Sequence, residues 1–301
     1  RVSCDGSSDE QGGSVGVILW IPALVKHSDP LHFLEYPMSS SPDFLVRPVA
    51  QFQKPVHRLG LAVSFGIDEP GIRWAFDQGL NYVFWTPTAR KLTAPLRDAI
   101  RGGNRERFVI ATGPMLGFFR GSIRRRAERV LKVLGTDYID IFQLFWLGKT
   151  SAWTEGTMEE LVKLREEGKV RALGVSIHDR VRAGRLAEDS PLDMLMVRYN
   201  AAHPGAEQDI FPHLERRHPA IVAYTATAWR RLLSRPSGWA GPVPTAGDCY
   251  RFCLSNPHVD IVLAGPANVA QLQETLKALE KGPLSPDEQR WMREFGKRAH
   301  R

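Results

Sequence analysis

The sequence predicts an α/β fold: a single (β/α)8 barrel of the TIM-barrel type, with a C-terminal helix and an irregular N-terminal extension. From Arg58 onward, a short apolar run followed by a longer amphipathic segment occurs eight times. Continuous apolar runs of this kind are typical of parallel strands that are buried on both faces. The chain has 301 residues, and a barrel of this type needs about 250. Eight strand–helix units in this order favour a closed barrel over an open sheet.

The first four strand–helix units form the first half of the predicted barrel. Gly79 and Gly168 follow the first and fourth helices, and glycine is the usual residue just past a helix C-terminus. Asp68, Asp140 and Asp193 lie at helix or strand starts, so we expect them to cap helices or to face the bottom of the barrel. The strands are predicted over residues 59–63, 82–85, 108–112 and 138–145, and the helices after them over 69–78, 95–101, 122–134 and 158–167.

The remaining four units complete the ring, and one more helix comes after them. No low-complexity linker interrupts residues 58–280, so we expect one domain. The strands are predicted over residues 170–176, 194–199, 221–225 and 261–264, and the helices over 182–188, 210–217, 248–254, 269–279 and, at the C-terminus, 286–297.

The N-terminal residues do not share this pattern. The chain opens with Arg1, and residues 1–37 show no helical or strand period that continues into the barrel region. Met38 is followed by three serines and a proline, as at a natural start. We therefore predict that residues 1–37 are an unstructured extension or an artefact of gene prediction. The barrel is then expected within residues 38–301.

Composition and charge argue against several classes of partner. No stretch reaches the ~18–20 apolar residues that a membrane span requires. The net charge is +7, but the densest basic run, Arg124–Arg126, has no interleaved aromatic residues, which argues against nucleic-acid binding. Cys249 and Cys253 would share one helix face, and nothing completes a disulfide framework or a metal site. These features predict a protein of the reducing cytoplasm.

Four sequence phrases resemble the aldo-keto reductase superfamily. Residues 134–140, LGTDYID, resemble the "LGxDYxD" that enters the fourth strand of that family. Residues 173–176, LGVS, are similar to the end of its fifth strand, and Tyr199-Asn200 with Glu207 to its sixth-strand motif. Residues 265–276, GPANVAQLQETL, resemble its cofactor segment. The phrases fall in family order, and the resemblance covers roughly residues 58–297.

The resemblance implies an NADPH-linked reduction of a carbonyl by a tetrad of Asp, Tyr, Lys and His. In the family the tyrosine donates the proton while the cofactor delivers hydride. A free phenol has a pKa near ~10, which is too high for an efficient acid at neutral pH. The lysine stabilises the phenolate, and the aspartate holds the lysine in place. The histidine orients the substrate oxygen.

All four tetrad positions of this sequence carry residues that cannot perform that chemistry. Phe84 stands at the Asp position, Ala89 at the Tyr position, Gly113 at the Lys position and Phe145 at the His position. Loss of the lysine alone would leave a buried aspartate unpaired, at a cost of ~3–5 kcal/mol, whereas joint replacement by apolar or small residues avoids that cost. The resemblance therefore predicts no catalytic residues of the family type and no ordinary carbonyl reduction.

The family's cofactor site is matched only in part. Ile177, Met196, Ala267 and Thr275 depart from the family pattern, which removes expected hydrogen bonds to the nicotinamide and the adenosine phosphate. NADP(H) binding therefore stays an open expectation, with no preference over NAD(H). The positions that match are Tyr224, on which the nicotinamide would stack, Thr225, Gly265, Asn268, Gln271 and Glu274.

Functional groups of a barrel gather at the C-terminal ends of its strands. The residues there predict an aromatic-lined pocket for a small molecule, in which two arginines could contact an anionic group in a bidentate manner. His203 is a further imidazole near this face, and no metal motif or nucleophile motif occurs. The predicted pocket residues are Trp85, Arg90, Trp146, His178, Arg198 and Asn200.

Three functions remain open from the sequence. The first is a divergent oxidoreductase that keeps a nicotinamide cofactor. The second is a non-catalytic binding or regulatory protein, a pseudoenzyme on the reductase scaffold, because the fold alone does not imply activity. The third is a lyase or isomerase reaction that uses His178 or His203. The sequence does not indicate an oligomeric state.

Overall fold

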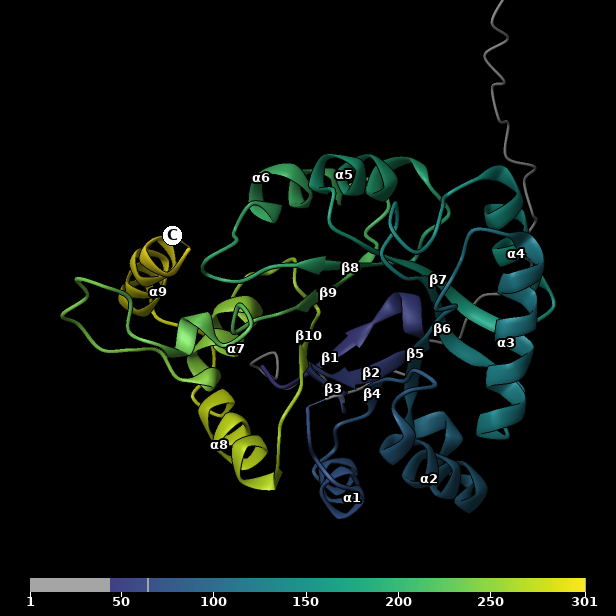
Figure 1. Cartoon of the computed structure of the whole chain (residues 1–301), viewed down its shortest axis with the longest axis horizontal. Coiled ribbons are helices and arrows are strands. Elements are labelled where there is room, and N and C mark those ends of the chain that lie inside the picture. The colour runs from purple at the N-terminus through teal and green to yellow at the C-terminus, as the bar shows by residue number, and fades with distance from the viewer. Residues whose placement is uncertain (1–43, 64, 301) are drawn as a thin grey trace, which may run out of the picture. The chain divides into compact units, whose positions relative to one another are not determined.

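The computed structural model describes residues 44–63 and 65–300 (Figure 1). The predicted N-terminal extension, residues 1–37, lies outside the described residues. Eight parallel strands close into a barrel in the order β10-β3-β4-β5-β6-β7-β8-β9. The TIM-barrel prediction is confirmed, and every strand end lies within one residue of its predicted place. The strands are β3 Leu59–Ala62, β4 Tyr82–Phe84, β5 Val109–Thr112, β6 Ile139–Leu144, β7 Val170–Ile177, β8 Met194–Arg198, β9 Ala220–Tyr224 and β10 Ile261–Ala264.

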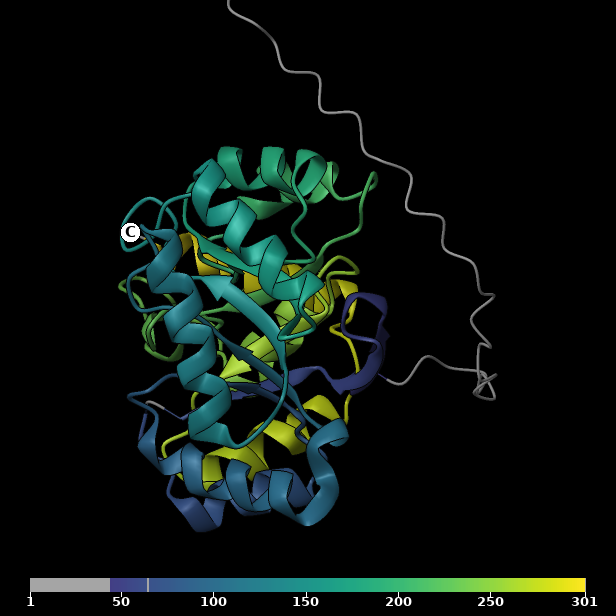
Figure 2. The same cartoon turned by 90° about the vertical axis from the view of Figure 1, so that its right-hand side faces the viewer.

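The helices lie on the outside of the strands (Figures 1 and 2). Asp68 caps the first of them as predicted, because its side chain accepts a hydrogen bond from the Gly71 amide. Ser285 begins the C-terminal helix with a capping box. The helices are α1 Glu69–Asp77, α2 Arg90–Ala99, α3 Arg120–Leu134, α4 Glu155–Glu166, α5 Arg180–Asp189, α6 Ala206–Asp209, α7 Ala246–Leu254, α8 Val269–Leu279 and α9 Pro286–Ala299.

Two helix predictions were wrong. The helix expected over residues 210–217 is replaced by the one-turn α6 and a 3-10 turn, Phe211–His213. Ile210 has non-helical angles, φ −126° and ψ −53°, and Pro212 has no amide hydrogen to donate, so no longer helix forms. The helix expected to begin at Pro95 begins instead at Arg90. Proline is usually tolerated in the first turn, but α2 accommodates Pro95 in its interior.

A β-hairpin that the sequence pattern did not predict precedes the barrel strands. Strands β1 (Val46–Val49) and β2 (Lys54–His57) pair antiparallel around a 3-10 turn, Ala50–Phe52. Phe52 and Val56 belong to the same apolar cluster as the residues that point into the barrel, and the Phe52 ring lies 6.1 Å from that of Tyr82. The hairpin therefore extends the packed layers that fill a barrel of this kind.

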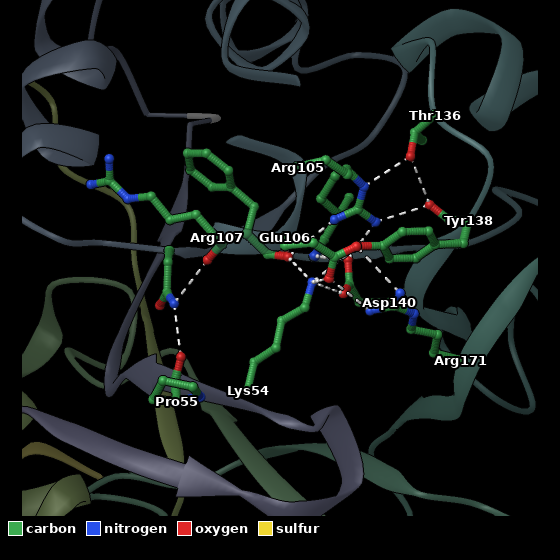
Figure 3. Close-up of polar contacts among 12 residues, drawn as sticks. Lys54, Pro55, Arg105, Glu106, Arg107, Thr136, Tyr138, Asp140 and Arg171 are labelled. Atoms are coloured by element: carbon green, nitrogen blue, oxygen red, sulfur yellow. Dashed lines mark hydrogen bonds and ion pairs between the residues drawn. The ribbon is translucent and has the colours of Figure 1, made fainter. Parts of the chain in front are cut away.

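A polar network joins the hairpin to the start of β6 (Figure 3). Asp140 is 1% exposed, and its carboxylate accepts hydrogen bonds from Lys54 Nζ at 2.8 Å, Arg105 Nη2 at 2.7 Å and the Ile110 amide at 3.0 Å. The guanidinium of Arg105 also lies 3.8 Å from the centre of the Tyr138 ring. Because these groups lie at strand starts, this is the bottom face, where charged residues stabilise the fold. The bottom-face prediction for Asp140 is thereby confirmed.

Candidate functional site

Three of the four residues predicted at the tetrad positions lie together at the C-terminal mouth of the barrel. Phe84 ends β4, and Gly113 and Phe145 directly follow β5 and β6. The rings of Phe84 and Phe145 contact each other, with centroids 5.5 Å apart and planes tilted by 59°. Ala89 is buried just before α2. An apolar pair therefore occupies the floor of the mouth, and none of the four positions carries a titratable side chain.

Gly113 has no room for any side chain. A Cβ built on this residue would lie 1.8 Å from the carbonyl oxygen of Gln143 and 3.2 Å from Cε1 of Phe145. Contacts of a Cβ below 3.0 Å are essentially never seen. The ends of β5 and β6 therefore leave no space for a longer side chain at this position.

A buried glutamine lies below the aromatic pair. Gln143 and Phe145 are two residues apart, so within a strand they face the same side, the barrel interior. Gln143 is fully buried, and its Nε2 donates to the sulfur of Met196 at 3.2 Å. Its Oε1 and the Thr112 hydroxyl have no partner among the described residues. The Gln143 Oε1 acceptor thus has no donor among the described residues beneath the mouth. A buried acceptor without a donor lowers the stability of the fold by ~1–3 kcal/mol.

Three ring side chains line one side of the mouth. The hydroxyl of Tyr224 lies 3.0 Å from Nε2 of His178, and their rings meet edge to face with centroids 5.8 Å apart. Trp146 lies beyond His178, at 6.0 Å between centroids, and is exposed. The structure therefore brings together three residues that were predicted separately for the cofactor site and the pocket.

The pKa shifts of Tyr224 and His178 do not favour acid catalysis by this pair. Burial raises the pKa of Tyr224 to about 12, although the positive charge of Arg198 opposes the shift. Burial, and then the charge of Arg198, lowers the pKa of His178. A reductase tyrosine needs the opposite shift, because its phenol must release a proton near neutral pH.

Two predicted pocket residues lie elsewhere. Trp85 is 2% exposed and its indole N–H donates to Oγ1 of Thr93 at 3.0 Å, so it packs under α2. Successive residues of a strand face opposite sides, and its neighbour Phe84 is the one that faces the interior. Asn200 is fully buried, donates to the Thr225 carbonyl at 2.8 Å, and accepts from two backbone amides. These two side chains hold loops in place rather than line the mouth, whereas Arg90 is exposed at the start of α2.

The side chains of the cofactor-like segment already have partners within the chain. Asn268 caps α8 by accepting from the Gln271 amide at 3.0 Å, and Oε1 of Gln271 accepts from the Ala267 amide at 2.9 Å. The ring of Phe65 lies against Gly265, where a Cβ would approach it to 2.2 Å. No lysine or arginine occurs in residues 265–274. The remaining matched positions are Glu274, which is exposed on α8, and Thr225, whose hydroxyl donates to the Tyr224 carbonyl.

A second Tyr–Lys–Asp set exists at the opposite end of the barrel, in the bottom network (Figure 3). Lys54 Nζ lies 3.3 Å from the Tyr138 hydroxyl, which donates to Glu106. Burial, and next the hydrogen bond to Glu106, raises the pKa of Tyr138 far above its usual range. Three of the four residue types of the tetrad therefore form a structural network here. Its members lie at the wrong end of the strands for barrel catalysis.

Metal and membrane signals are absent from the described part of the chain. Within residues 44–63 and 65–300, no group of three His, Cys, Asp or Glu side chains could hold a metal ion. None of the helices over the same residues combines the length and the apolar character needed to cross a bilayer. Cys249 and Cys253 are buried free thiols, and both lie on the helix α7, where their spacing predicted a shared face.

Comparison with known proteins agrees with this architecture. Residues 59–235, more than half of the chain, match the model of the aldo/keto reductase family, and the chain belongs to that family. It is 29% identical over 165 residues to aldo-keto reductase YhdN of Bacillus subtilis (strain 168), covering 51% of this chain and 50% of that protein. It is 30% identical over 93 residues to the NADH-specific methylglyoxal reductase of Escherichia coli (strain K12), covering 30% of this chain and 28% of that protein.

Solved structures show the same fold. Aldo-keto reductase AKR11C1 from Bacillus halodurans superposes with a TM-score of 0.69 in its apo form and 0.70 in its holo form. Sequence identity is 22% and 21%, and each match covers 83% of this chain and 95% of that chain. By contrast, the matches to the two curated relatives from B. subtilis and E. coli span half or less of each relative's length.

Proposed function

We propose that this chain is an aldo/keto-reductase-fold protein that does not perform ordinary carbonyl reduction and that binds a small molecule at the mouth of its barrel. One observation carries the proposal: Gly113 has no room for a side chain, and a Cβ there would lie 1.8 Å from the Gln143 carbonyl oxygen. Phe84 and Phe145 fill the adjacent space. No group at these positions can donate a proton to a carbonyl or make a phenol more acidic.

Members of the family normally bind NAD(P)H, and the residues present fit that cofactor only in part. Tyr224 offers a partly exposed aromatic face beside the mouth, which suits stacking of the nicotinamide ring. The adenosine segment is less suitable, because Asn268 and Gln271 bond to their own helix terminus and residues 265–274 contain no lysine or arginine for a 2′-phosphate. The residues therefore fit the ring end of the cofactor and not its phosphate end. NADP(H) is the first ligand to test.

The test combines turnover and binding on the full chain. We expect no NADPH oxidation with 4-nitrobenzaldehyde above the rate without protein, followed by absorbance of the reduced cofactor. A parallel titration with NADPH and NADH monitors tryptophan fluorescence, since Trp146 lies beside the mouth. Binding without turnover supports a retained cofactor pocket. Absence of both leaves recognition of another small molecule, whereas saturable, aldehyde-dependent oxidation contradicts the proposal.

A divergent oxidoreductase is the second candidate, because the Tyr224 hydroxyl and His178 form a protonatable pair at the mouth, 3.0 Å apart. If that pair donates the proton, Tyr224→Phe abolishes turnover while leaving cofactor quenching intact. Equal activity in wild type and Tyr224→Phe excludes this route. A cytoplasmic location stays a prediction that the two buried free thiols of α7 support.

A further inference from the structure

A small cavity lies on the outer side of the barrel, between α2 and α3. The two helices pack against each other in the outer ring (Figure 1). Trp85, which follows β4, lines the cavity, and because successive strand residues face opposite sides, it points away from the interior that Phe84 faces. The cavity is therefore separate from the barrel mouth. Its volume is about 140 Å³, and apolar cavities of roughly 150 Å³ hold one benzene ring.

Most of the cavity wall is apolar. Pro87, Val130 and Val133 line it together with the Trp85 ring. The indole N–H of Trp85 donates to Oγ1 of Thr93 on α2 at 3.0 Å, so the ring is held in place and its one polar group already has a partner. A ligand in the cavity therefore meets the apolar face of this ring.

Two arginines of α3 supply the charged side of the cavity, Arg126 and Arg129. They are three residues apart on one helix, so they lie on the same face, where like charges repel each other. Neither guanidinium makes a hydrogen bond or an ion pair with the residues that the structure describes. By contrast, Arg120 and Arg124 of the same helix pair with glutamates of α4. The unpaired positive charge of α3 is thus on the side of α2.

The acidic residues of the two helices face other neighbours. Helix α2 contains one acidic residue, Asp98, and α3 contains one, Glu128. Asp98 pairs with Arg73 of α1. Glu128 lies 3.9 Å from Arg124 and 3.3 Å from Lys169. Neither carboxylate therefore neutralises the cavity, and an anion from outside the chain is the partner that its charge favours.

We propose that this cavity binds a small monocarboxylic acid whose apolar part is the size of one ring. The apolar part packs between the Trp85 ring and Val130, and the carboxylate accepts hydrogen bonds from Arg126 and Arg129. A planar guanidinium matches a carboxylate in a bidentate pair, and the bound anion offsets the repulsion between the two arginines. A solvated arginine needs no partner, but these two border an apolar cavity that is large enough for a ring. The site does not depend on the function proposed for the barrel mouth.

Calorimetric titration of the full chain with benzoate tests the site. We expect saturable binding with a Kd on the order of 1 mM, because so small a ligand makes few contacts. Arg126→Gln/Arg129→Gln should weaken binding ~10-fold or more, because the charge-assisted hydrogen bonds are lost. The matched control is Arg125→Gln/Lys132→Gln, which removes two exposed cations of the same helix that do not line the cavity. It should bind within ~2-fold of wild type, because only longer-range charge changes.

Two further probes separate the contribution of the charge from that of the ring. Acetate carries the carboxylate without the ring, and benzyl alcohol carries the ring without the charge, so each should bind at least ~10-fold more weakly than benzoate. Val133→Phe fills the cavity and should abolish benzoate binding while it leaves both arginines in place. Thermal denaturation of each variant confirms that it folds.

Three results would overturn the site: no saturable heat with benzoate up to ~20 mM, equal benzoate affinity in the two double variants, or acetate binding as tightly as benzoate. The first means that the cavity takes no such ligand. The second means that benzoate binds elsewhere on the chain, the barrel mouth included, and the third that the arginines attract any anion. Loss of binding in Arg126→Gln/Arg129→Gln alone assigns the carboxylate to these two arginines.

Discussion

Replacing Gly113 by alanine adds one methyl group at the most crowded backbone position of the mouth. To bring the new Cβ from 1.8 Å to an observed separation of 3.0 Å from the Gln143 carbonyl, β5 and β6 must part by more than 1 Å. Overpacking a close-packed interior costs typically 1–3 kcal/mol, and this site should lie at or above the upper end, at about 3 kcal/mol. A loss of that size lowers the Tm by roughly 6–12 °C in a domain of ~150–250 residues.

Thermal denaturation followed by circular dichroism measures this change, with urea denaturation as a second measurement. Gly121→Ala is the matched control, since Gly121 lies in the first turn of α3 with open space around its Cβ position. It should stabilise the protein by about 0.4–1 kcal/mol by restricting the unfolded chain. A Gly113→Ala protein that melts within ~1 °C of wild type would refute the reasoning that β5 and β6 have closed this position.

The same structure supports three further predictions. Asp140→Asn should lower the free energy of unfolding, measured by urea titration, by ~3–5 kcal/mol, because the lysine and arginine bonded to it lose their buried counter-charge. The control Asp189→Asn, which breaks an exposed ion pair, should lower it by less than ~1 kcal/mol. Burial lowers the pKa of folded His203 to about 4, below the unfolded value of ~6.5, so the unfolded state takes up the proton first and stability falls as the pH drops from 6.5 to 4. In His203→Gln, the Tm should therefore depend less on pH between ~6.5 and ~4. A slope of Tm against pH equal to that of wild type would contradict this assignment. Simultaneous restoration of Asp, Tyr, Lys and His at the four tetrad positions should yield no aldehyde reduction in the NADPH assay, because the lysine has no space; measurable turnover would show that the strands can reopen.

The ends of the barrel strands could be predicted from sequence because each strand is a continuous apolar run with a distinct boundary. The hairpin could not, because Pro48 and Pro55 interrupt its apolar pattern and proline is unusual within paired strands. The role of Lys54 could not be predicted either, because the hairpin that carries it was not predicted. Its partner Asp140 is 86 residues away in sequence, and only the folded hairpin brings the two side chains together.

The direction of side chains at the mouth was the weaker part of the site prediction. Residues were assigned to the pocket because they lie at strand ends, but neighbouring residues of a strand face opposite sides. Applied to Phe84 and Trp85, this rule indicates that only one of the two can face the interior, and the structure shows that it is Phe84.

If Phe84, Ala89, Gly113 and Phe145 occupy the tetrad positions, as the resemblance predicts, these four residues are physically compatible with one another, and the fold does not depend on the family's reaction. The Phe84 and Phe145 ring centroids are 5.5 Å apart, so a histidine placed at Phe145 would face the apolar Phe84 ring. An aspartate placed at Phe84 would lie beside the Phe145 ring without a cation, because Gly113 has no space for a lysine. Each single reversion therefore buries a polar or charged group without its partner, which costs several kcal/mol. The barrel has no such dependence, because its strands and helices bury their apolar faces regardless of the tetrad. Selection for stability alone would thus keep the barrel while opposing a stepwise return of the tetrad.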